Sequence, residues 1–404
     1  MDDLLSRAEA HDRWRLEECL NLQPSENVTS PQVRRLLASD LGHRYTLPWK
    51  GEIHGAYVEN AYGGTRYLDE VEDIGEGLAR ALFTAKHASL KPLSGHLAGM
   101  LLLLSACRKG DKVLVIDAKH GGYDGYMPQY LPAMLDLHLQ VDFLPFDEAR
   151  WNLDYERAAM RIIESRPRLV LLGSSFLLFP FNLRHLRGPC NTAGALLAYD
   201  GSHVLGLIAG REFQRPLEEG ADILVGSTHK SMPGPQGGLF LTNRDDVFER
   251  FKDNLTWRVM DNAHWNRIAG VAQALLEMKH FGAAYAKAVV ENARTLARAL
   301  DEEGFPVKYR DLGYTRSHQI HLDEVRLREG WGLTPNEFSV RCGRNNLIVD
   351  AVARLGSQEV TRMGAGAEDM REIAGLTARA AKGDDVTAAV KSVRSRLRLS
   401  YCFG

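Results

Sequence analysis

A lysine at the end of a short apolar run is the residue whose surroundings most clearly suggest chemistry. Lys230 closes the segment Ser227–Lys230, which follows the apolar run Ile223–Val225 and precedes a turn rich in proline and glycine, Ser231–Gly238. Such a turn can hold a lysine amine in a cleft, where desolvation lowers the pKa of an amine and makes it a nucleophile toward aldehydes. An ordinary surface lysine in a loop is the alternative, and this segment alone favours neither interpretation.

An acid at the end of a second apolar run favours the catalytic interpretation. Asp200 ends the run Leu196–Asp200, 30 residues before Lys230. Since α/β sheets bind ligands at the carboxyl ends of their strands, an acid there can keep the nitrogen of a pyridine ring protonated. A strand-end aspartate by itself is more often a turn or helix cap. Together, the two residues predict a site for pyridoxal 5′-phosphate, with Lys230 as Schiff-base partner and Asp200 at the ring nitrogen.

Two glycine-containing turns earlier in the chain fit the same cofactor. The segment Pro92–His96 has the pattern of a strand-to-helix turn, whose backbone N–H groups and Ser94 hydroxyl could bind a phosphate. A plain helix N-cap is the alternative. The segment His120–Tyr123 places an aromatic ring after two glycines, where the ring of Tyr123 could lie against a flat cofactor or simply fill the core. Four such features in this order favour a single cofactor site.

The composition limits the possible partners and compartments. A length of 404 residues predicts two domains, or a large domain with a smaller one, and a formal net charge of -2 gives no reason to expect a nucleic-acid or membrane partner. The N-terminus is charged throughout, unlike a secretory signal, and the apolar run Leu97–Ala106 is too short to span a bilayer. Five scattered cysteines without a CxxC pair predict thiols in a reducing cytoplasm and no metal site. They are Cys19, Cys107, Cys190, Cys342 and Cys402.

The elements that must position these residues alternate between strands and helices from about residue 68 onward. Apolar strands of this length between helices predict an α/β fold with a largely parallel sheet covered on both faces. The expected strands are Lys112–Ile116, Arg168–Leu172, Leu196–Tyr199, Ile223–Val225 and Gly238–Leu241. Expected helices are Asp69–Phe83, Leu97–Cys107, Tyr155–Glu164 and His264–Glu303.

Three regions are predicted along the chain. Residues 1–67 would form an N-terminal helix (Leu4–Leu20) and an irregular active-site arm, residues 68–290 a large cofactor-binding domain, and residues 291–404 a small C-terminal domain. In the C-terminal region the patterns predict strands at Val307–Tyr309, Gln319–Leu322 and Leu347–Val349, and helices at Asn336–Cys342, Glu368–Lys382 and Asp385–Leu397.

Together these segments resemble serine hydroxymethyltransferase and its relatives among the fold-type I pyridoxal-phosphate enzymes. The resemblance implies a large domain with a mostly parallel seven-stranded sheet, a smaller α+β C-terminal domain, and a homodimer with shared active sites. The matching segments are Pro24–Asn27, Tyr62–Gly64, Ser94-Gly95, His120–Gly122, Asp200–His203 and Thr228–Gly238.

The resemblance also assigns roles to residues, in three groups. Catalytic roles fall to Lys230, Asp200, His203, Tyr123 and Tyr45. Cofactor contacts fall to Ser94, Gly95, His96, Tyr123, Ser175, Asp200, His203, Ser227, His229 and Lys230. Substrate contacts fall to Ser25, Glu26, Tyr45, Tyr62 and Arg354, of which Arg354 would bind the substrate carboxylate. An arginine on an exposed helix or loop is the alternative for Arg354.

Several departures from the family pattern concern the folate-dependent part of its chemistry. Leu47 stands where the family has a glutamate that serves proton transfer, and the segment around it carries an insertion. The residues that could substitute for this glutamate are Glu52, His54 and Glu59. A glycine-rich phosphate loop is missing, and Arg258 stands roughly in its place. The loop before Arg354 is shorter than in the family, and Gln236 replaces a family arginine. These departures predict a folate-independent relative.

The sequence therefore predicts a pyridoxal-phosphate enzyme acting on an L-amino acid and leaves the reaction open. One hypothesis is aldol-type cleavage or transaldol exchange at Cα–Cβ of a β-hydroxy-α-amino acid. The other is β-elimination or decarboxylative oxidative deamination of an S-conjugated cysteine or similar amino acid in antibiotic biosynthesis. Folate-dependent serine–glycine interconversion comes third. A regulatory or structural pyridoxal-phosphate-binding protein is disfavoured, because such a protein does not need Arg354.

Overall fold

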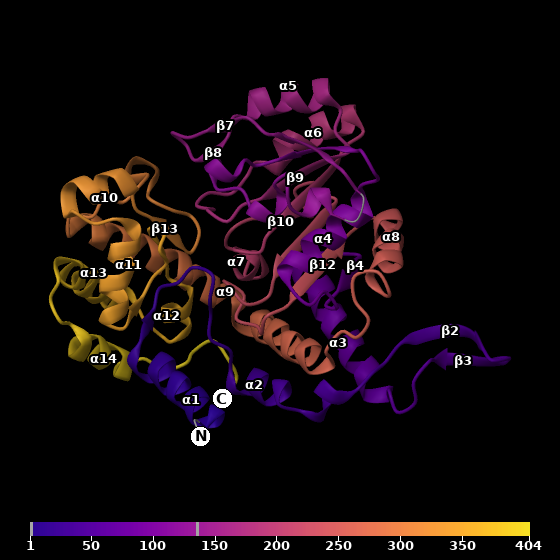
Figure 1. The fold of residues 1–404 in the computed structure, drawn as a ribbon, viewed down its shortest axis with the longest axis horizontal. Coiled ribbons are helices and arrows are strands. Elements are labelled where there is room, and N and C mark those ends of the chain that lie inside the picture. Colours follow the sequence, from indigo (N-terminus) through magenta and orange to yellow (C-terminus); the bar gives the residue numbers. More distant parts are fainter. Residues whose placement is uncertain (1–2, 135–136) are drawn as a thin grey trace. The chain divides into compact units, whose positions relative to one another are not determined.

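The computed structural model describes residues 3–134 and 137–404 (Figure 1). The chain divides into two compact units. The sheet unit comprises Thr29–Phe176, Phe181–Gly282 and Phe403–Gly404, and the C-terminal unit comprises Met1–Val28, Leu177–Pro180 and Ala283–Cys402. The unit boundary thus falls inside the long helix α9 (Trp265–Glu302), and residues 1–28 cluster with the C-terminal residues.

A seven-stranded sheet forms the centre of the sheet unit, as the family resemblance implied. Its strand order is β4-β12-β11-β10-β9-β5-β6. The five strands from β11 to β6 are parallel, whereas β12 and β4 are antiparallel to their neighbours. The strands are β4 (His87–Ser89), β5 (Lys112–Val115), β6 (Gln140–Phe143), β9 (Leu169–Gly173), β10 (Leu196–Asp200), β11 (Ile223–Ser227) and β12 (Gly238–Thr242).

The four strands from β9 to β12 are fully buried because helices cover the sheet. Helix α4 packs on β11 and β12, and α6 packs on β10 beside α5. Leucine and alanine on nearly every side of α4 leave no polar stripe, which explains why most of this helix is buried. The helices of the unit are α3 (Arg66–Phe83), α4 (Gly95–Ala106), α5 (Tyr155–Ser165), α6 (Leu183–Ala193), α7 (Leu205–Ala209), α8 (Asp245–Leu255) and the first half of α9.

The arm predicted to be irregular contains regular structure. Helix α2 (Pro31–Leu37) begins at an N-cap, Ser30, and a hairpin of β2 (Pro48–Ile53) and β3 (Ala56–Asn60) follows. Figure 1 shows this hairpin extending away from the sheet. Its root is fixed by side-chain hydrogen bonds, because Thr46 Oγ1 donates to Asp69 Oδ1 at 2.7 Å and Asn60 Nδ2 donates to Thr46 Oγ1 at 2.6 Å.

The C-terminal unit has a core of leucine, alanine and phenylalanine side chains between short strands and helices. Strand β1 (Leu20–Asn21) pairs in parallel with β14 (Leu347–Ile348), and β13 (Gln319–His321) pairs antiparallel with β15 (Arg354–Gly356). The helices are α1 (Leu4–Arg13), α10 (Glu324–Trp331), α11 (Pro335–Arg344), α12 (Gln358–Arg362), α13 (Ala367–Lys382) and α14 (Thr387–Arg396).

Two element predictions in this unit need correction. Helix α1 ends at Arg13 and not near Leu20, because a five-residue π-helical turn, Trp14–Glu18, takes over. The predicted strand Val307–Tyr309 is reduced to a single bridge between Val307 and Leu322, since Tyr309 turns left-handed at φ 62°. Among the described residues, no helix is both long and apolar enough to cross a bilayer.

Candidate active site

The parallel strands bring the polar residues that follow them to one edge of the sheet. Asp200 at the end of β10 lies opposite Gly173 of β9 and Val225 of β11, so the three strands end side by side. A pocket of about 320 Å³, including its open mouth, lies at this edge. It is lined by Gly95, His96, Tyr123, Ser174, Ser175, Asp200, Ser202, His203, Ser227 and Lys230. The structure thus brings eight of the predicted site residues together in the sheet unit.

Asp200 is the buried anion of this pocket, with 6% of its surface exposed. Its Oδ1 accepts hydrogen bonds from the backbone N of Ser202 at 3.0 Å and from Ser202 Oγ at 2.6 Å. Its Oδ2 accepts one from the hydroxyl of Tyr126 at 2.7 Å. Because a buried carboxylate must be compensated by such donors, these bonds stabilise the charge and fix the plane of the carboxylate.

Lys230 lies in a loop that is closed by hydrogen bonds between its own residues. Thr228 makes three of these bonds. Its backbone O accepts from Gly234 N at 2.9 Å, and its backbone N donates to Gly237 O at 3.1 Å. Its side-chain Oγ1 donates to Pro235 O at 2.7 Å. The turn of prolines and glycines therefore closes behind Lys230, which is partly buried and lines the pocket. Lys230 thus lies in the lining of the pocket, and its role as the amine that binds the cofactor stays a prediction.

The N-terminus of α4 forms another wall of the pocket. Ser94 caps the helix, since its Oγ accepts from Leu97 N at 3.2 Å, and Gly95 follows in the pocket lining. A Cβ atom on Gly95 would lie 2.0 Å from Ser227 Oγ, so only glycine fits there. The helix N-terminus therefore approaches the end of β11 closely, and backbone N–H groups at the start of a helix can bind phosphate.

Tyr123 and His96 form a hydrogen-bonded pair in the pocket lining. The distance between Tyr123 Oη and His96 Nδ1 is 2.7 Å. Burial, and then the charges of Asp200 and Asp124, raise the pKa of Tyr123 to about 12. The phenol is therefore protonated at neutral pH, and the exposed ring of His96 connects it to solvent.

The remaining predicted residues of the sheet unit lie outside the described lining of this pocket. Tyr45 and Tyr62 are exposed at the root of the hairpin, and their rings face each other with centroids 5.4 Å apart. His229 precedes Lys230 but is absent from the described lining residues. Glu52, His54 and Glu59 are exposed on the hairpin, and Arg258 donates to Asn254 Oδ1 at 2.9 Å.

Three predicted substrate residues belong to the C-terminal unit. Arg354 is on β15 and mostly buried, and its Nε donates to Asp350 Oδ2 at 2.7 Å, so it is not the exposed arginine of the alternative interpretation. Ser25 accepts a hydrogen bond from Gln23 Nε2 at 3.2 Å. Glu26 forms an ion pair with Arg15 and accepts from Asn21 Nδ2 at 2.9 Å.

Sequence reasoning gave no role to three residues at the site. Ser174 and Ser202 line the pocket, and Tyr126 donates to Asp200. Ser202 stands in the Asp200–His203 segment, so the segment itself was a signal for it. Tyr126 is harder to recognise from the sequence. It stands three residues after Tyr123, but its hydrogen-bond partner Asp200 is 74 residues away in the chain.

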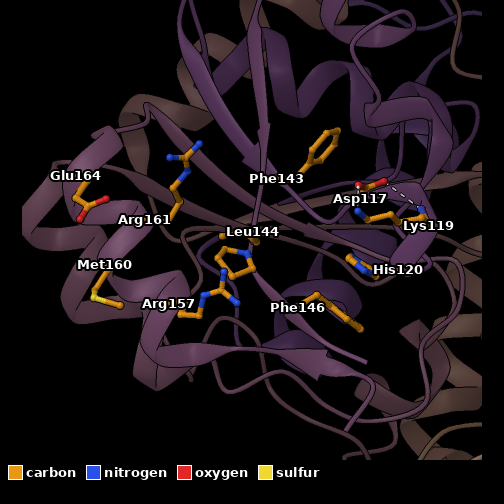
Figure 2. A pocket seen from close by; sticks show the side chains of 11 residues that line it. Asp117, Lys119, His120, Phe143, Leu144, Phe146, Arg157, Met160, Arg161 and Glu164 are labelled. Atoms are coloured by element: carbon orange, nitrogen blue, oxygen red, sulfur yellow. Dashed lines mark hydrogen bonds and ion pairs between the residues drawn. The ribbon is translucent and has the colours of Figure 1, made fainter. Parts of the chain in front are cut away.

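A larger hollow lies elsewhere in the sheet unit, between the end of the edge strand β6 and helix α5 (Figure 2). It holds about 1110 Å³, including space open to solvent. Figure 2 shows Arg157, Met160, Arg161 and Glu164 on one side, and Asp117, Lys119, His120, Phe143 and Phe146 on the other.

Each cation of this hollow already has a carboxylate partner. Lys119 pairs with Asp117 at 3.5 Å, Arg157 pairs with Asp154 at 3.8 Å, and Arg161 pairs with Asp142. No group of three or more His, Cys, Asp or Glu side chains suited to a metal ion occurs among residues 3–134 and 137–404. The polar groups that converge are those of the pocket around Asp200 and Lys230.

Comparison with known proteins identifies the family of the chain and supports its fold. The family model for serine hydroxymethyltransferase matches residues 1–377. The serine hydroxymethyltransferase of Korarchaeum cryptofilum is 38% identical over 418 residues, which cover 97% of this chain and 94% of that protein. That of Pyrococcus furiosus is 39% identical over 388 residues, covering 92% and 88%. A crystal structure of L-threonine transaldolase from Pseudomonas fluorescens in the internal aldimine state matches with a TM-score of 0.86 and 26% identity, over 99% of this chain and 93% of that one.

Proposed function

Because the chain belongs to the serine hydroxymethyltransferase family, we propose that it breaks or exchanges the Cα–Cβ bond of a β-hydroxy-α-amino acid without folate. The chain is a fold-type I enzyme that depends on pyridoxal 5′-phosphate and acts as a transferase or lyase. The observation that carries the folate-independent reaction is Leu47, which stands where the family has its proton-transferring glutamate.

The residues of the pocket fit pyridoxal 5′-phosphate. Gly95 lets the N-terminus of α4 lie close to the end of β11 in the pocket wall, so we assign the phosphate to the backbone N–H groups that follow Ser94. We assign the aldehyde to the amine of Lys230 and the ring nitrogen to Asp200, whose carboxylate is buried and fixed in its plane. Tyr123 would lie against the ring, and Ser175 and His203 would contact its substituents.

The bound cofactor supplies an electron sink for a carbanion at Cα. The chain's own residues decide which protons move. Asp200 is placed to hold a proton on the ring nitrogen, and the hydroxyl of Tyr123 can exchange a proton with solvent through His96, 2.7 Å away. Because Leu47 cannot transfer protons, this hydroxyl is the candidate for proton transfer at the substrate.

Two further assignments rest on the family and on the chemistry of the side chains. We assign the substrate carboxylate to Arg354, whose guanidinium plane is fixed by Asp350 and suits bidentate binding. We also propose a homodimer with shared active sites. In its support, Tyr45 and Tyr62, which the family places at the site, are absent from the described lining of the chain's own pocket.

The name of the structural neighbour supports the aldol-type reaction, because that protein is an L-threonine transaldolase. Glu52 and Glu59 of the hairpin of β2 and β3 could replace the family's glutamate, but they lie outside the described lining of the chain's own pocket. A folate-dependent reaction would need such a replacement.

The test is a screen of the purified holoenzyme against glycine, threonine, serine and S-substituted cysteines, with and without tetrahydrofolate. We expect threonine to release acetaldehyde without folate, together with glycine in cleavage or, with an added acceptor aldehyde, together with a new β-hydroxy-α-amino acid in exchange. Turnover of serine only with tetrahydrofolate would overturn folate independence. Pyruvate and a thiol from an S-substituted cysteine, with no reaction of threonine, would establish β-elimination instead.

A further inference from the structure

Tyr126 is buried directly beside the proposed cofactor site and has no role in the family assignments made above. We propose that Tyr126 is a positioning residue, which fixes both the carboxylate of Asp200 and the ring of Tyr123 for their contacts with the cofactor. The inference rests on the proposed roles of Asp200 and Tyr123 and does not depend on which bond at Cα is broken.

The hydrogen bonds around Asp200 show what the hydroxyl of Tyr126 adds. Ser202 supplies two donors, and both bind Oδ1, at 3.0 and 2.6 Å. The donor that reaches Oδ2 is Tyr126 Oη, at 2.7 Å. A carboxylate has about four acceptor positions, so these three bonds leave about one for a ring nitrogen. Ser202 alone would fix one oxygen and allow the other to turn about it.

The space for the ring of Tyr126 is created by two glycines from distant parts of the chain. A Cβ on Gly99 in α4 would lie 2.6 Å from Tyr126 Oη, and a Cβ on Gly173 at the end of β9 would lie 2.6 Å from its ring. The side chain has 1% of its surface exposed. A hydroxyl enclosed in this way must find an acceptor within the protein, and Asp200 provides it.

The hydroxyl remains a donor under all ordinary conditions. Burial, and then the charge of Asp200, raise the pKa of Tyr126 well above its usual value of 10. The bond to Oδ2 therefore persists through the pH range in which the enzyme can be assayed. The hydroxyl of Tyr126 is enclosed and bound to Oδ2, whereas the hydroxyl of Tyr123 reaches the exposed His96, so the geometry of Tyr126 indicates positioning and not proton transfer.

The same ring also supports Tyr123. The two rings meet edge to face, with centroids 5.2 Å apart and an angle of 84° between their planes. The backbone N of Tyr126 donates to Tyr123 O at 3.0 Å, which holds the two residues in one turn. A single side chain thus contacts the residue assigned to the ring nitrogen and the residue assigned to the ring face.

The experiment replaces Tyr126 with phenylalanine and uses Tyr199→Phe as its matched control. Tyr199 lies in β10 next to Asp200 and is equally buried, but its hydroxyl donates to Gln214 Oε1 at 3.0 Å. Both variants lose one buried hydroxyl bond, so a purely structural effect would lower both melting temperatures and leave the cofactor unaffected.

For Tyr126→Phe we expect kcat to fall about 10-fold, the size of one hydrogen bond to a charged group, while KM for the amino acid stays within about twofold. Titration of the apoenzyme with pyridoxal 5′-phosphate should show weaker binding, and the pH midpoint of the bound cofactor's absorbance should move. Tyr199→Phe should leave both spectroscopic readouts at their wild-type values. Identical spectra, affinities and kcat in Tyr126→Phe and Tyr199→Phe would overturn the inference.

A second variant narrows the space that Gly99 leaves for Tyr126 and keeps the hydroxyl of Tyr126. Gly99→Ala should push Tyr126 Oη away from Oδ2 and shift the absorbance midpoint in the same direction as Tyr126→Phe; a wild-type midpoint would contradict the proposal. Both titrations are read without substrate. A failure of the proposed aldol-type reaction would therefore leave them interpretable, whereas a wild-type apoenzyme that forms no cofactor band would show that the proposed site itself is wrong.

Discussion

The pocket around Asp200 and the hollow beside β6 belong to the same unit and both adjoin the carboxyl ends of parallel strands. The hollow is larger, about 1110 against 320 Å³, and contains three cations. Its cations are at least 44% exposed along their side chains and are paired with neighbouring carboxylates. In the pocket, by contrast, Asp200 is almost fully buried and receives its donors from uncharged groups.

This difference explains why one strand-end site is suited to chemistry and the other is not. Exposed ion pairs contribute little binding energy because water screens them, whereas a buried carboxylate with fixed donors can act on a bound ring without reorganising. The number of segments matters as well. The pocket collects residues from the ends of β9, β10 and β11, the turn after β5 and the start of α4, while the polar groups of the hollow pair within their own neighbourhood.

The largest difference between the two regions should appear when a lysine is removed from each. Lys230→Ala should lower turnover by at least about 10³-fold, because no other amine is assigned to the cofactor aldehyde. The absorbance band near the visible edge should vanish, while Lys119→Ala, in the hollow, should keep both band and turnover. Steady-state assays and spectra of the two purified variants give the comparison. A band that persists in Lys230→Ala would place the cofactor elsewhere.

Removal of an acid from each region should give the next largest effect. Asp200→Ala should cost about 2–4 kcal/mol of carbanion stabilisation, a loss of roughly 30-fold to 1000-fold in kcat, with some cofactor retained. Glu164→Ala in the hollow should leave kcat unchanged. Single-turnover and steady-state rates on the same substrate would measure both. Near-normal turnover of Asp200→Ala would refute its role at the ring nitrogen.

A smaller effect is expected from adding one methyl group to the pocket wall. Gly95→Ala places a Cβ against Ser227 Oγ, so the N-terminus of α4 must move, and overpacking of this kind costs about 1–3 kcal/mol. We expect the dissociation constant for pyridoxal 5′-phosphate to rise about 10-fold. Gly188→Ala in α6 is the control, since a Cβ there meets no atom within 4 Å. Equal cofactor affinity in the two variants would remove α4 from the phosphate site.

The site residues that could be predicted from the sequence are identified by residues close to them in the chain. Asp200 is the last residue of an apolar strand, Lys230 comes three residues after another, and Gly95 follows a helix cap, so the order of residue types identifies them. The central strands β9 to β12 were predicted for the same reason, since each is a continuous buried run.

The features that sequence reasoning missed depend on contacts between distant segments. Tyr126 acquires its role from Asp200 and from the space left by Gly99 and Gly173, none of which is local to it. Strand β4 has three residues, and edge strand β6 has no fully buried residue, so neither has an apolar run to recognise. In the same way, nothing around Glu26 in the sequence indicates its ion pair with Arg15.

The smallest effect is predicted for the part of the hollow that looks most like an anion site. The double variant Arg157→Ala/Arg161→Ala removes two exposed cations from the hollow. Each of them is already paired with a carboxylate, Arg157 with Asp154 and Arg161 with Asp142. Exposed pairs of this kind contribute about 0–1 kcal/mol, so we expect a slightly lower melting temperature and kcat/KM within about twofold of wild type. Thermal denaturation of the holoenzyme and steady-state kinetics would measure the two quantities. A large fall in kcat/KM would mean that the hollow takes part in the reaction. In that case, ion pairing of the cations with neighbouring carboxylates would not distinguish the hollow from the active site.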